Sequence, residues 1–351
     1  MFRTNLGRCG LALAVLVAAL VAAMPLGAAA DNAYTVTALV SDQPGVAPVL
    51  DPDLVNAWGL AASTTSPWWV ADNETSVSTL YNGNTGQKVA LTVTVGTDSG
   101  PTGVVFNGGS GFVVTNGTVS APARFIFDSE DGLLRGWNPA VDPTNALVAA
   151  SGDPGANFKG LAIAGGMLYA ADFHNGLVDV FDGSWNIVNR FTDPGLPSGY
   201  APFGIQAIGS RIFVAFAKQD EGAEDEVAGQ GLGFVDAFDT DGNLIARVAQ
   251  HGLLNAPWGL ARAPGDFGRF SGDLLVGNFG DGRINAFEPQ ANGRFEFRGQ
   301  LRDGSGDPIA IDGLWALEFG NGANAGPTNT LLFTAGPDDE THGLFGRITA
   351  G

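Results

Sequence analysis

Three side chains of this sequence are our candidates for transferring a proton: His174, His342 and Lys159. Asp172 lies two residues before His174, and Asp338 lies four residues before His342. A carboxylate that orients an imidazole is the usual arrangement around a general base. We therefore take the two histidines as candidate bases and Lys159 as a further catalytic candidate. No Gly-x-Ser-x-Gly segment accompanies them, so the sequence does not indicate a serine hydrolase.

Four oxygen-bearing side chains could instead ligate a metal ion: Asp172, Asn278, Asp312 and Asp338. Carboxylate and amide oxygens are the ligands that Ca²⁺ prefers, so Ca²⁺ is the candidate cofactor. The spacing of these residues matches no standard metal motif. Aspartate and asparagine are also common turn formers, so a purely structural role stays open for each of them.

The elements that must position these side chains repeat along the chain. A Gly-centred step into an apolar strand occurs six times, with spacings between 44 and 57 residues, at Gly59, Gly103, Gly160, Gly204, Gly259 and Gly313. A hairpin that ends in an aromatic residue follows each step, and the hairpins Leu168–Gly183 and Leu274–Pro289 align without a gap. A unit of about 40–60 residues with three or four short strands is a propeller blade.

This period predicts an all-β chain folded as a six-bladed β-propeller with four-stranded blades. One blade cannot bury both of its faces, so the blades must pack face to face in a ring. The last repeat has no outermost strand before the chain ends, while the alternating segment Tyr34–Val40 has no place in the first repeat. We expect this N-terminal strand to complete the last blade and close the ring, which removes a free sheet edge.

In such a ring, ligands meet the axis at the face made by two sets of loops. One set leads into the innermost strands, and the other joins the second and third strands. The candidate ligand rim on these loops is Asn56, Trp58, Asp172, Phe203, Trp258, Asn278, Asp312, Trp315 and Asp338. The hairpin loops also contribute a larger set of polar residues: Asp72, Asn73, Glu74, Asp128, Glu130, Lys218, Asp220, Asp281, Asp339 and Glu340. The acidic stretch between Lys218 and Gly231 interrupts the fourth hairpin and is expected to be a solvated insertion.

Residues 1–30 have the pattern of a secretory signal peptide, and residues 31–351 form the single predicted propeller domain. Two arginines precede an unbroken apolar run from Leu11 to Ala23, which is shorter than a membrane-spanning helix. Small residues fit cleavage after Ala30. The only cysteine, Cys9, lies in this leader. We therefore expect a secreted or periplasmic protein without disulfides, and no membrane association after cleavage.

The charge balance limits the partners of the chain. It has 36 acidic and 17 basic residues, for a formal net charge of −19. Such a field repels phosphate backbones, so we expect no nucleic-acid partner. An acidic surface also favours solubility or cations. We expect a monomer.

Six segments carry a family resemblance: Leu39–Gly45, Asn56–Leu60, Gly199–Phe203, Ala217–Asp220, Gly277–Asn285 and Phe333–Pro337. Through them, nearly all of the mature sequence resembles a family of uncharacterised exported bacterial six-bladed β-propeller proteins, of the NHL/TolB-like propeller class. The resemblance implies the fold and the export. It implies no established activity.

Three functions are compatible with these features. The first is a rigid module that binds a small molecule, a glycan or a protein at the axial polar rim. The second is a calcium-assisted hydrolase or lactonase, by analogy with the calcium-dependent lactonases of the six-bladed class. The third is a structural protein of an extracellular matrix. We favour the binding module, because no group of residues is specific enough to define a reaction.

Overall fold

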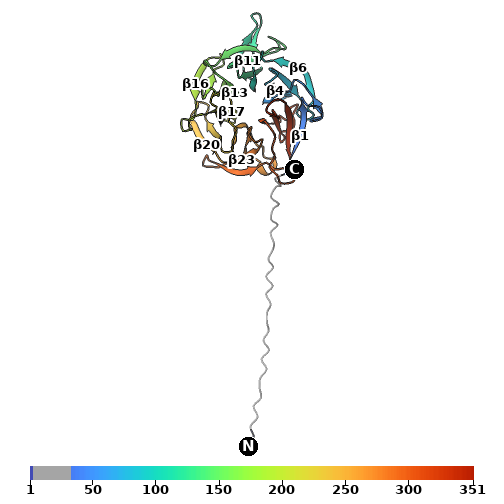
Figure 1. Ribbon diagram of the computed structural model, residues 1–351, viewed down its shortest axis with the longest axis vertical. Coiled ribbons are helices and arrows are strands. Elements are labelled where there is room, and N and C mark those ends of the chain that lie inside the picture. The colour runs from blue at the N-terminus through green and yellow to red at the C-terminus, as the bar shows by residue number, and fades with distance from the viewer. Residues whose placement is uncertain (3–32) are drawn as a thin grey trace.

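The computed structural model describes residues 1–2 and 33–351, which contain six β-sheets of four or five strands arranged as a ring (Figure 1). The predicted six-bladed propeller with four-stranded blades is confirmed. The predicted signal peptide and its cleavage after Ala30 lie outside the described residues, apart from Met1 and Phe2. In the described part of the chain, no helix is long and apolar enough to cross a membrane.

Each of the first three blades is built of antiparallel strands that follow one another outward from the axis, with one extra hairpin inserted in blade 2. Blade 1 contains β3 (Ala57–Ala61), β4 (Trp68–Asp72), β5 (Val77–Tyr81) and β6 (Lys88–Thr94). Blade 2 contains β7 (Pro101–Phe106), β10 (Phe125–Ser129), β11 (Leu133–Trp137) and β12 (Leu147–Ser151), with the extra hairpin β8 (Val113–Thr115) and β9 (Ser120–Pro122). Blade 3 contains β13 (Phe158–Ala164), β14 (Met167–Asp172), β15 (Leu177–Phe181) and β16 (Ile187–Phe191).

The remaining blades follow the same plan, and the last one takes strands from both ends of the chain. Blade 4 contains β17 (Tyr200–Ile208), β18 (Arg211–Lys218), β19 (Phe234–Phe238) and β20 (Leu244–Gln250). Blade 5 contains β21 (Pro257–Arg262), the short 3-10 helix η1 (Gly268–Phe270), β22 (Leu274–Asn278), β23 (Ile284–Pro289) and β24 (Phe295–Gln300). Blade 6 contains β25 (Leu314–Phe319), β26 (Leu331–Ala335), β27 (Leu344–Ala350), β1 (Tyr34–Ser41) and β2 (Val49–Leu50).

The ring is closed as predicted, by the N-terminal strand. β1 pairs antiparallel with β27, with Tyr34 opposite Ala350. The Tyr34 hydroxyl donates to the Phe267 carbonyl at 3.1 Å and accepts the Phe270 N–H at 3.3 Å, which fastens the strand to blade 5 as well. The short β2 adds an unpredicted fifth strand, parallel to β1.

Burial along the strands follows their position in the blade. The second strand β4 and the third strand β19 are buried along their whole length, whereas the outermost strands β6 and β16 are largely exposed or half-buried. Successive side chains of a strand point to opposite faces of the blade, so both faces need a neighbour. One hydrophobic cluster accordingly joins Ile126 and Leu134 of blade 2 to Leu168 and Phe181 of blade 3. The core is divided among the interfaces between blades.

The repeated glycine marks the closest approach between neighbouring innermost strands. A Cβ atom on Gly59, Gly204 or Gly259 would lie 2.4, 2.0 or 2.5 Å from a backbone carbonyl oxygen of the next blade. No side chain fits at such a distance, so glycine is required for the blades to meet. The repeated glycine in the sequence therefore results from the close packing of the blades at the axis.

Strand pairing corrects the sixth copy of this repeat. Leu314 and Leu317 pair with β26 in the same register in which Ala57 and Leu60 pair with β4. The residue equivalent to Gly59 is consequently Ala316, and the assignment to Gly313 was wrong. At this seam the Thr334 hydroxyl accepts the Ala316 N–H at 3.0 Å and donates to the Trp58 carbonyl at 2.5 Å. A hydroxyl group thus links the innermost strands of blades 6 and 1. The other five contacts between innermost strands depend on a glycine.

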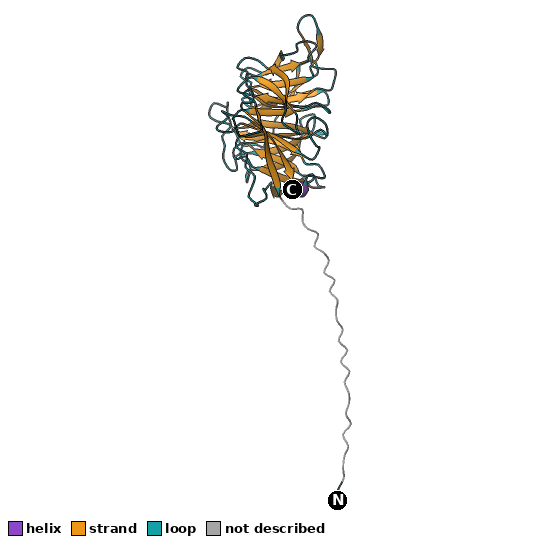
Figure 2. Cartoon of the chain, turned by 90° about the vertical axis from the view of Figure 1, so that its right-hand side faces the viewer, coloured by secondary structure: helices purple, strands orange, loops and turns teal. Residues whose placement is uncertain are grey.

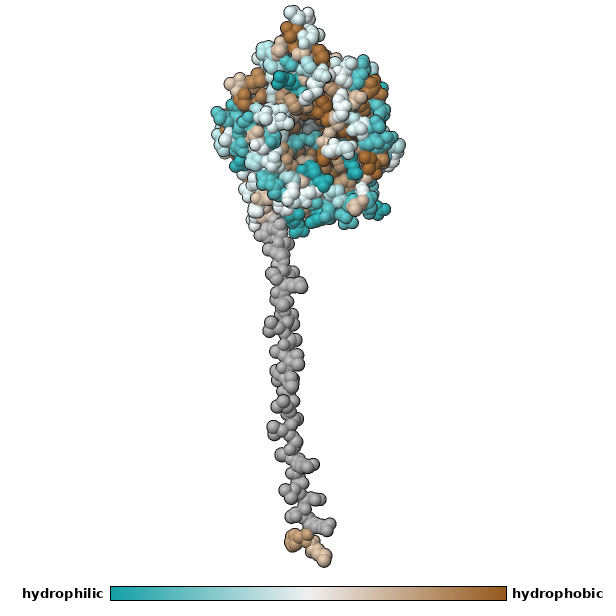
Figure 3. Space-filling model, turned by 180° about the vertical axis from the view of Figure 1, so that it is seen from behind, coloured by the Kyte–Doolittle hydropathy of each residue, from teal (hydrophilic) through white to brown (hydrophobic). Residues whose placement is uncertain are grey.

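The two faces of the disc offer two ends of the axis. We call the face formed by the loops that lead into the innermost strands the upper face, and the opposite one the lower face. Seen edge-on in Figure 2, the strands occupy the middle of the disc and loops extend on both sides. Figure 3 shows one face of the ring, hollowed near its centre and bordered by hydrophobic and hydrophilic residues. Both ends of the axis are places where loops of several blades meet.

Candidate functional site

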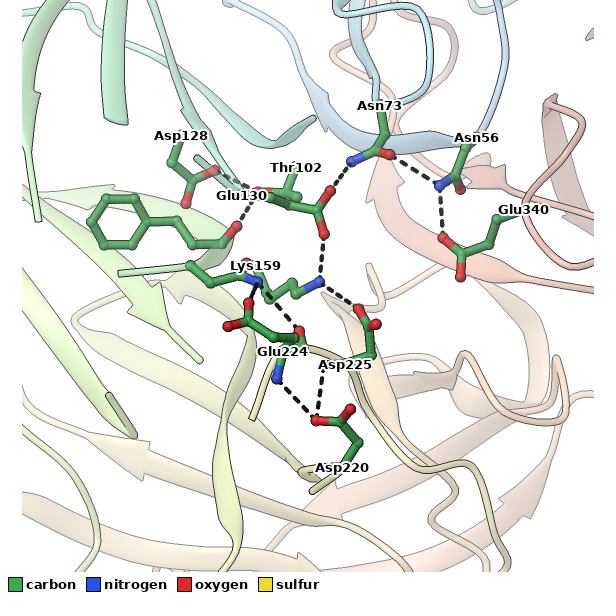
Figure 4. Close-up of polar contacts among 12 residues, drawn as sticks. Asn56, Asn73, Thr102, Asp128, Glu130, Lys159, Asp220, Glu224, Asp225 and Glu340 are labelled. Carbon is green, nitrogen blue, oxygen red and sulfur yellow. Dashed lines mark hydrogen bonds and ion pairs between the residues drawn. The ribbon is translucent and has the colours of Figure 1, made fainter. Parts of the chain in front are cut away.

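Polar side chains from five blades meet on the upper face (Figure 4). We call this set the polar ring: Asn56 and Asn73 of blade 1, Glu130 of blade 2, Lys159 of blade 3, Asp225 of blade 4 and Glu340 of blade 6. Lys159 lies on the innermost strand β13, and the others lie in loops. The fold therefore brings together residues that are separated by up to most of the chain length.

Lys159 is the centre of the polar ring. Its side chain is 1% exposed, and Nζ lies 2.5 Å from Glu130 Oε1 and 3.3 Å from Asp225 Oδ1. Burial lowers the pKa of Lys159, whereas the carboxylates of Glu130 and Asp225 raise it. The rise is larger than the decrease, so the pKa of Lys159 is above its usual value. Nζ also lies 5.4 Å from the centre of the Trp58 ring, a cation–π contact. The side chain is therefore a charged ammonium group held at the axis.

Hydrogen bonds continue the ring from Glu130 to blade 6. Asn73 Nδ2 donates to Glu130 Oε2 at 3.0 Å. Asn56 Nδ2 donates to Asn73 Oδ1 at 3.3 Å and to Glu340 Oε2 at 2.7 Å. Burial raises the pKa of Glu340, and the bond from Asn56 opposes that shift. The predicted rim residue Asn56 thus connects the first and last blades across the ring seam.

The backbone that carries this connection is strained. Asp338, Asp339 and Glu340 have φ values of 57°, 53° and 65°, and Asn56 has a φ of 46°. Residues with a Cβ atom avoid this left-handed region, at a cost of about 1–2 kcal/mol each. The Asp338 N–H is held by Asp312 Oδ2 at 2.9 Å. Because strain of this kind is concentrated at functional sites, it adds weight to the polar ring as the candidate site.

The acidic loop, residues 218–231, folds back onto blade 3. We expected a solvated insertion, but the loop makes contacts with this blade. Asn157 Nδ2 donates to Glu224 Oε2 at 3.1 Å, while Asp225 reaches Lys159. Glu226 follows in the same loop, and burial, together with the nearby carboxylates, raises its pKa to about 8. The loop therefore supplies carboxyl groups to the polar ring, which its composition alone did not indicate.

Four aromatic residues of the predicted rim lie beneath the polar ring, and we call them the aromatic plug: Trp58, Phe203, Trp258 and Trp315. The rings of Trp58 and Trp315 stack with centroids 3.6 Å apart, and Phe203 and Trp258 meet Trp58 edge-on at 6.3 and 6.2 Å. None of the four is more than 9% exposed. They fill the axis and pack below the polar ring. A ligand on the upper face would therefore contact the polar groups and not these four aromatic side chains.

The four predicted metal ligands lie in three different blades. Asp172 accepts the N–H and the side-chain amide of Asn175 at 3.1 and 2.8 Å, and Asn278 Nδ2 donates to a backbone carbonyl at 2.8 Å. Asp312 and Asp338 are neighbours on the exposed edge of blade 6. Within the described residues, no three His, Cys, Asp or Glu side chains are grouped so that they could hold a metal ion. The contacts of Asp172 and Asn278 are those of loop-stabilising residues.

Both candidate histidines have a carboxylate partner, but neither partner is the one predicted from spacing. His174 Nδ1 lies 3.2 Å from Glu224 Oε1, and His342 Nδ1 lies 2.7 Å from Asp42 Oδ2. Asp172 was expected to orient His174 and instead binds Asn175. The reason is the folding of the acidic loop and of the N-terminal segment, which bring distant carboxylates closer than those next to the histidines in sequence.

Asp128 on β10, beside the ring in Figure 4, should make stability depend on pH. Its Oδ1 accepts the Gly103 N–H at 2.6 Å and the Thr102 hydroxyl at 3.0 Å, while the buried Oδ2 has no partner. Burial raises the pKa of Asp128 to about 7. Folding therefore favours the protonated acid, and this stabilisation is complete below about pH 4 and is lost as the pH rises through 7. We expect a loss of about 2 kcal/mol between pH 5.5 and 8.5 from this group.

Urea denaturation of the wild type and of Asp128→Asn at both pH values measures this contribution. The amide cannot ionise, so the decrease in the free energy of unfolding between pH 5.5 and 8.5 should be smaller in the variant by about 2 kcal/mol. An equal decrease in both proteins would show that Asp128 does not titrate in this range.

The fold and the polar ring define a six-bladed β-propeller with a polar site at one end of its axis. No protein-family model matches the chain. It is 35% identical over 333 residues to the uncharacterised protein R648 of Acanthamoeba polyphaga mimivirus, over 91% of this chain and 81% of that protein. It is 32% identical over 332 residues to the uncharacterised protein L690 of the same virus, over 90% and 85%. The chain belongs to the family of these proteins. Since these relatives are viral, the bacterial origin and the export of the family stay predictions.

Solved structures agree on the fold. The soluble aldose sugar dehydrogenase of Escherichia coli has a TM-score of 0.55 at 12% identity, over 91% of this chain and 100% of that one. The virginiamycin B lyase of Staphylococcus aureus has a TM-score of 0.51 at 13% identity, over 90% and 99%. At these identities the likeness shows the propeller fold and nothing about activity.

Proposed function

We propose that this propeller binds a small polyhydroxylated ligand, a glycan unit, at the polar ring. The observation that supports this most is the buried ammonium group of Lys159 among carboxyl groups of several blades. Removing an ammonium ion from water costs free energy. Clusters of buried ionisable groups with shifted pKa values are typical of functional sites. A ring built only for closure could use apolar contacts at this point, as the aromatic plug below it does.

The chemistry of the ring suits hydroxyl groups. Glu130, Asp225 and Glu340 supply acceptor oxygens, and Asn56 and Asn73 supply both donors and acceptors. The side chain of Asp225 is 75% exposed and that of Glu130 is 32% exposed, so their oxygens are within reach of a ligand. Sugar hydroxyls donate and accept hydrogen bonds, and several fixed polar groups can then set the orientation of one ring.

The other two candidate functions have less support. A calcium-assisted hydrolase or lactonase needs several oxygen ligands around one point, and no such group of three acidic or histidine side chains occurs in residues 33–351. No contact favours a structural matrix protein. We also propose that the protein acts as a secreted or periplasmic monomer without nucleic-acid partners, on the basis of its leader pattern and its charge.

A glycan array followed by calorimetric titration tests the proposal. The strongest oligosaccharide should bind the wild type in a saturable way and bind Glu340→Ala at least tenfold more weakly, since one bond to a charged group contributes about 1.5–3 kcal/mol. Glu296→Ala, an exposed change on the outer strand β24, serves as the matched control and should bind like the wild type. An array without binders, or equal affinity of Glu340→Ala and the wild type, would overturn the proposal.

A further inference from the structure

A cavity of about 270 Å³ opens on the lower face, at the other end of the axis from the polar ring. The far ends of the innermost strands line it, among them Leu60 of β3, Val104 of β7 and Ala162 of β13. A smaller space of about 30 Å³ continues inward, shares Leu60 and Val104 with the cavity, and ends against Trp258. Because Trp258 belongs to the aromatic plug, the cavity is blind and separate from the polar ring.

Two polar side chains face each other in this space, whose other lining side chains are apolar apart from Asn321. Gln206 of β17 and Glu318 of β25 line both the cavity and its inner extension, and Gln206 Nε2 donates to Glu318 Oε1. Glu318 is the only titratable residue that lines either space. Burial raises the pKa of Glu318 to about 8, and the bond from Gln206 opposes that shift. A half-buried carboxyl group thus lines the cavity, and no ion pair with it occurs among residues 33–351.

The bonding of Glu318 differs from that of the buried carboxyl groups that stabilise a blade. Asp72 accepts the N–H and the hydroxyl of Thr79, and Asp128 accepts the N–H of Gly103. Both carboxyl groups therefore provide acceptors for backbone N–H groups of their own blade. Among the described residues, the one hydrogen bond to the Glu318 side chain comes from Gln206. Glu318 is half-buried, lines the cavity and satisfies no backbone group, so its carboxyl group is available to a ligand that enters there.

We infer that this lower-face cavity binds a compact, mainly apolar molecule that carries one ammonium group, with the ammonium against Glu318 and Gln206. The apolar side chains of the wall, aliphatic and aromatic, suit a hydrocarbon body, and the carboxyl and amide oxygens suit N–H donors. The volume lies just below the usual range of ligand pockets, which starts at about 300 Å³, so the ligand must be compact. This site is independent of the glycan site that we propose on the upper face.

Binding should be linked to the proton of Glu318. The free protein holds Glu318 mainly as the neutral acid at pH 7, and an ammonium ligand favours the carboxylate, so binding releases a proton. Affinity should therefore rise about 25-fold between pH 6.5 and 8.5 for a ligand that stays cationic. Since no other titratable side chain lines the cavity, this dependence should follow Glu318 alone.

Calorimetric titration of the full chain with cyclohexylammonium chloride tests the inference, with cyclohexanol as the neutral probe of similar shape. We expect saturable binding of the cation at pH 8.5, about 25-fold weaker binding at pH 6.5, and at least tenfold weaker binding of cyclohexanol at pH 8.5. Glu318→Gln should lose the preference for the cation, whereas Glu296→Gln on the outer surface should keep it. Glu340→Ala should also bind the cation normally, which separates this site from the polar ring.

The comparison of the two probes on the wild type does not depend on the folding of any variant. Absence of saturable cation binding at pH 8.5 would overturn the inference, and so would equal affinity for cyclohexanol. Retention of the cation preference by a folded Glu318→Gln variant would overturn it as well, because another group would then hold the charge.

Discussion

Replacing Gly204 by alanine should lower the free energy of unfolding by about 3 kcal/mol, because the new methyl group overpacks the axis. The Cβ atom would lie 2.0 Å from the carbonyl oxygen of Trp258 in the next blade. The obstacle is backbone, which cannot turn aside as a flexible side chain can. The ring is closed by β1 and β27, so blade 4 cannot move away from blade 5 without disturbing another interface.

Gly265→Ala is the matched control for this substitution. Gly265 is exposed, and no atom lies within 4 Å of the position that a Cβ atom would take there. We expect a change within about 0.5 kcal/mol for this variant. Urea denaturation of both variants gives the two values under identical conditions. If Gly204→Ala were as stable as Gly265→Ala, the close approach of the innermost strands would not exist in solution.

The second large effect is expected for Lys159→Met, which removes the charge at the centre of the polar ring. Glu130, Asp225 and Glu340 would then face one another without a cation, and Asp225 would lose its tie to blade 3. We expect amide hydrogens of the acidic loop, residues 218–231, to exchange at least tenfold faster. Global stability should fall by about 2 kcal/mol, which is less than for a fully buried pair because Asp225 can turn to water.

Lys88→Met is the control that isolates the loop effect. Lys88 also pairs with two carboxylates, those of Asp51 and Asp53, but on β6 and away from the acidic loop. Its replacement should lower stability without faster exchange in residues 218–231. Hydrogen exchange followed by mass spectrometry measures both variants. Unchanged exchange of the loop in Lys159→Met would contradict the role of Lys159 as its anchor.

The fold could be predicted in detail because its constraints are local and repeated. Five of the inner strands need a glycine such as Gly59 or Gly204, and each blade needs short apolar strands, so the pattern recurs around the ring. The closing strand was also visible, since Tyr34–Val40 alternates and has no partner nearby. The sixth glycine was misassigned to Gly313, because the sixth inner strand has Ala316 at the repeated position. The Thr334 hydroxyl links the two inner strands there, and the repeat does not reveal this contact.

The site was predicted less well, because it depends on contacts between loops of different blades. The repeat identified Asn56 and Lys159 as members of the upper face, and both belong to the polar ring. Asp225 and Glu224 were not among the candidates, since nothing in the composition of the acidic loop says where it folds. Glu318 was missed for a different reason: the lower face was not considered as a place for ligands.

The most direct test of the proposed function is to locate the glycan on the wild-type protein. Hydrogen exchange is measured with and without a saturating concentration of the strongest oligosaccharide from the array. We expect at least tenfold slower exchange in the acidic loop and in Asp338–Glu340, with no change in the part of β25 that carries Glu318. Slower exchange only on the outer strands, or no change in either upper-face segment, would contradict a glycan site at the polar ring.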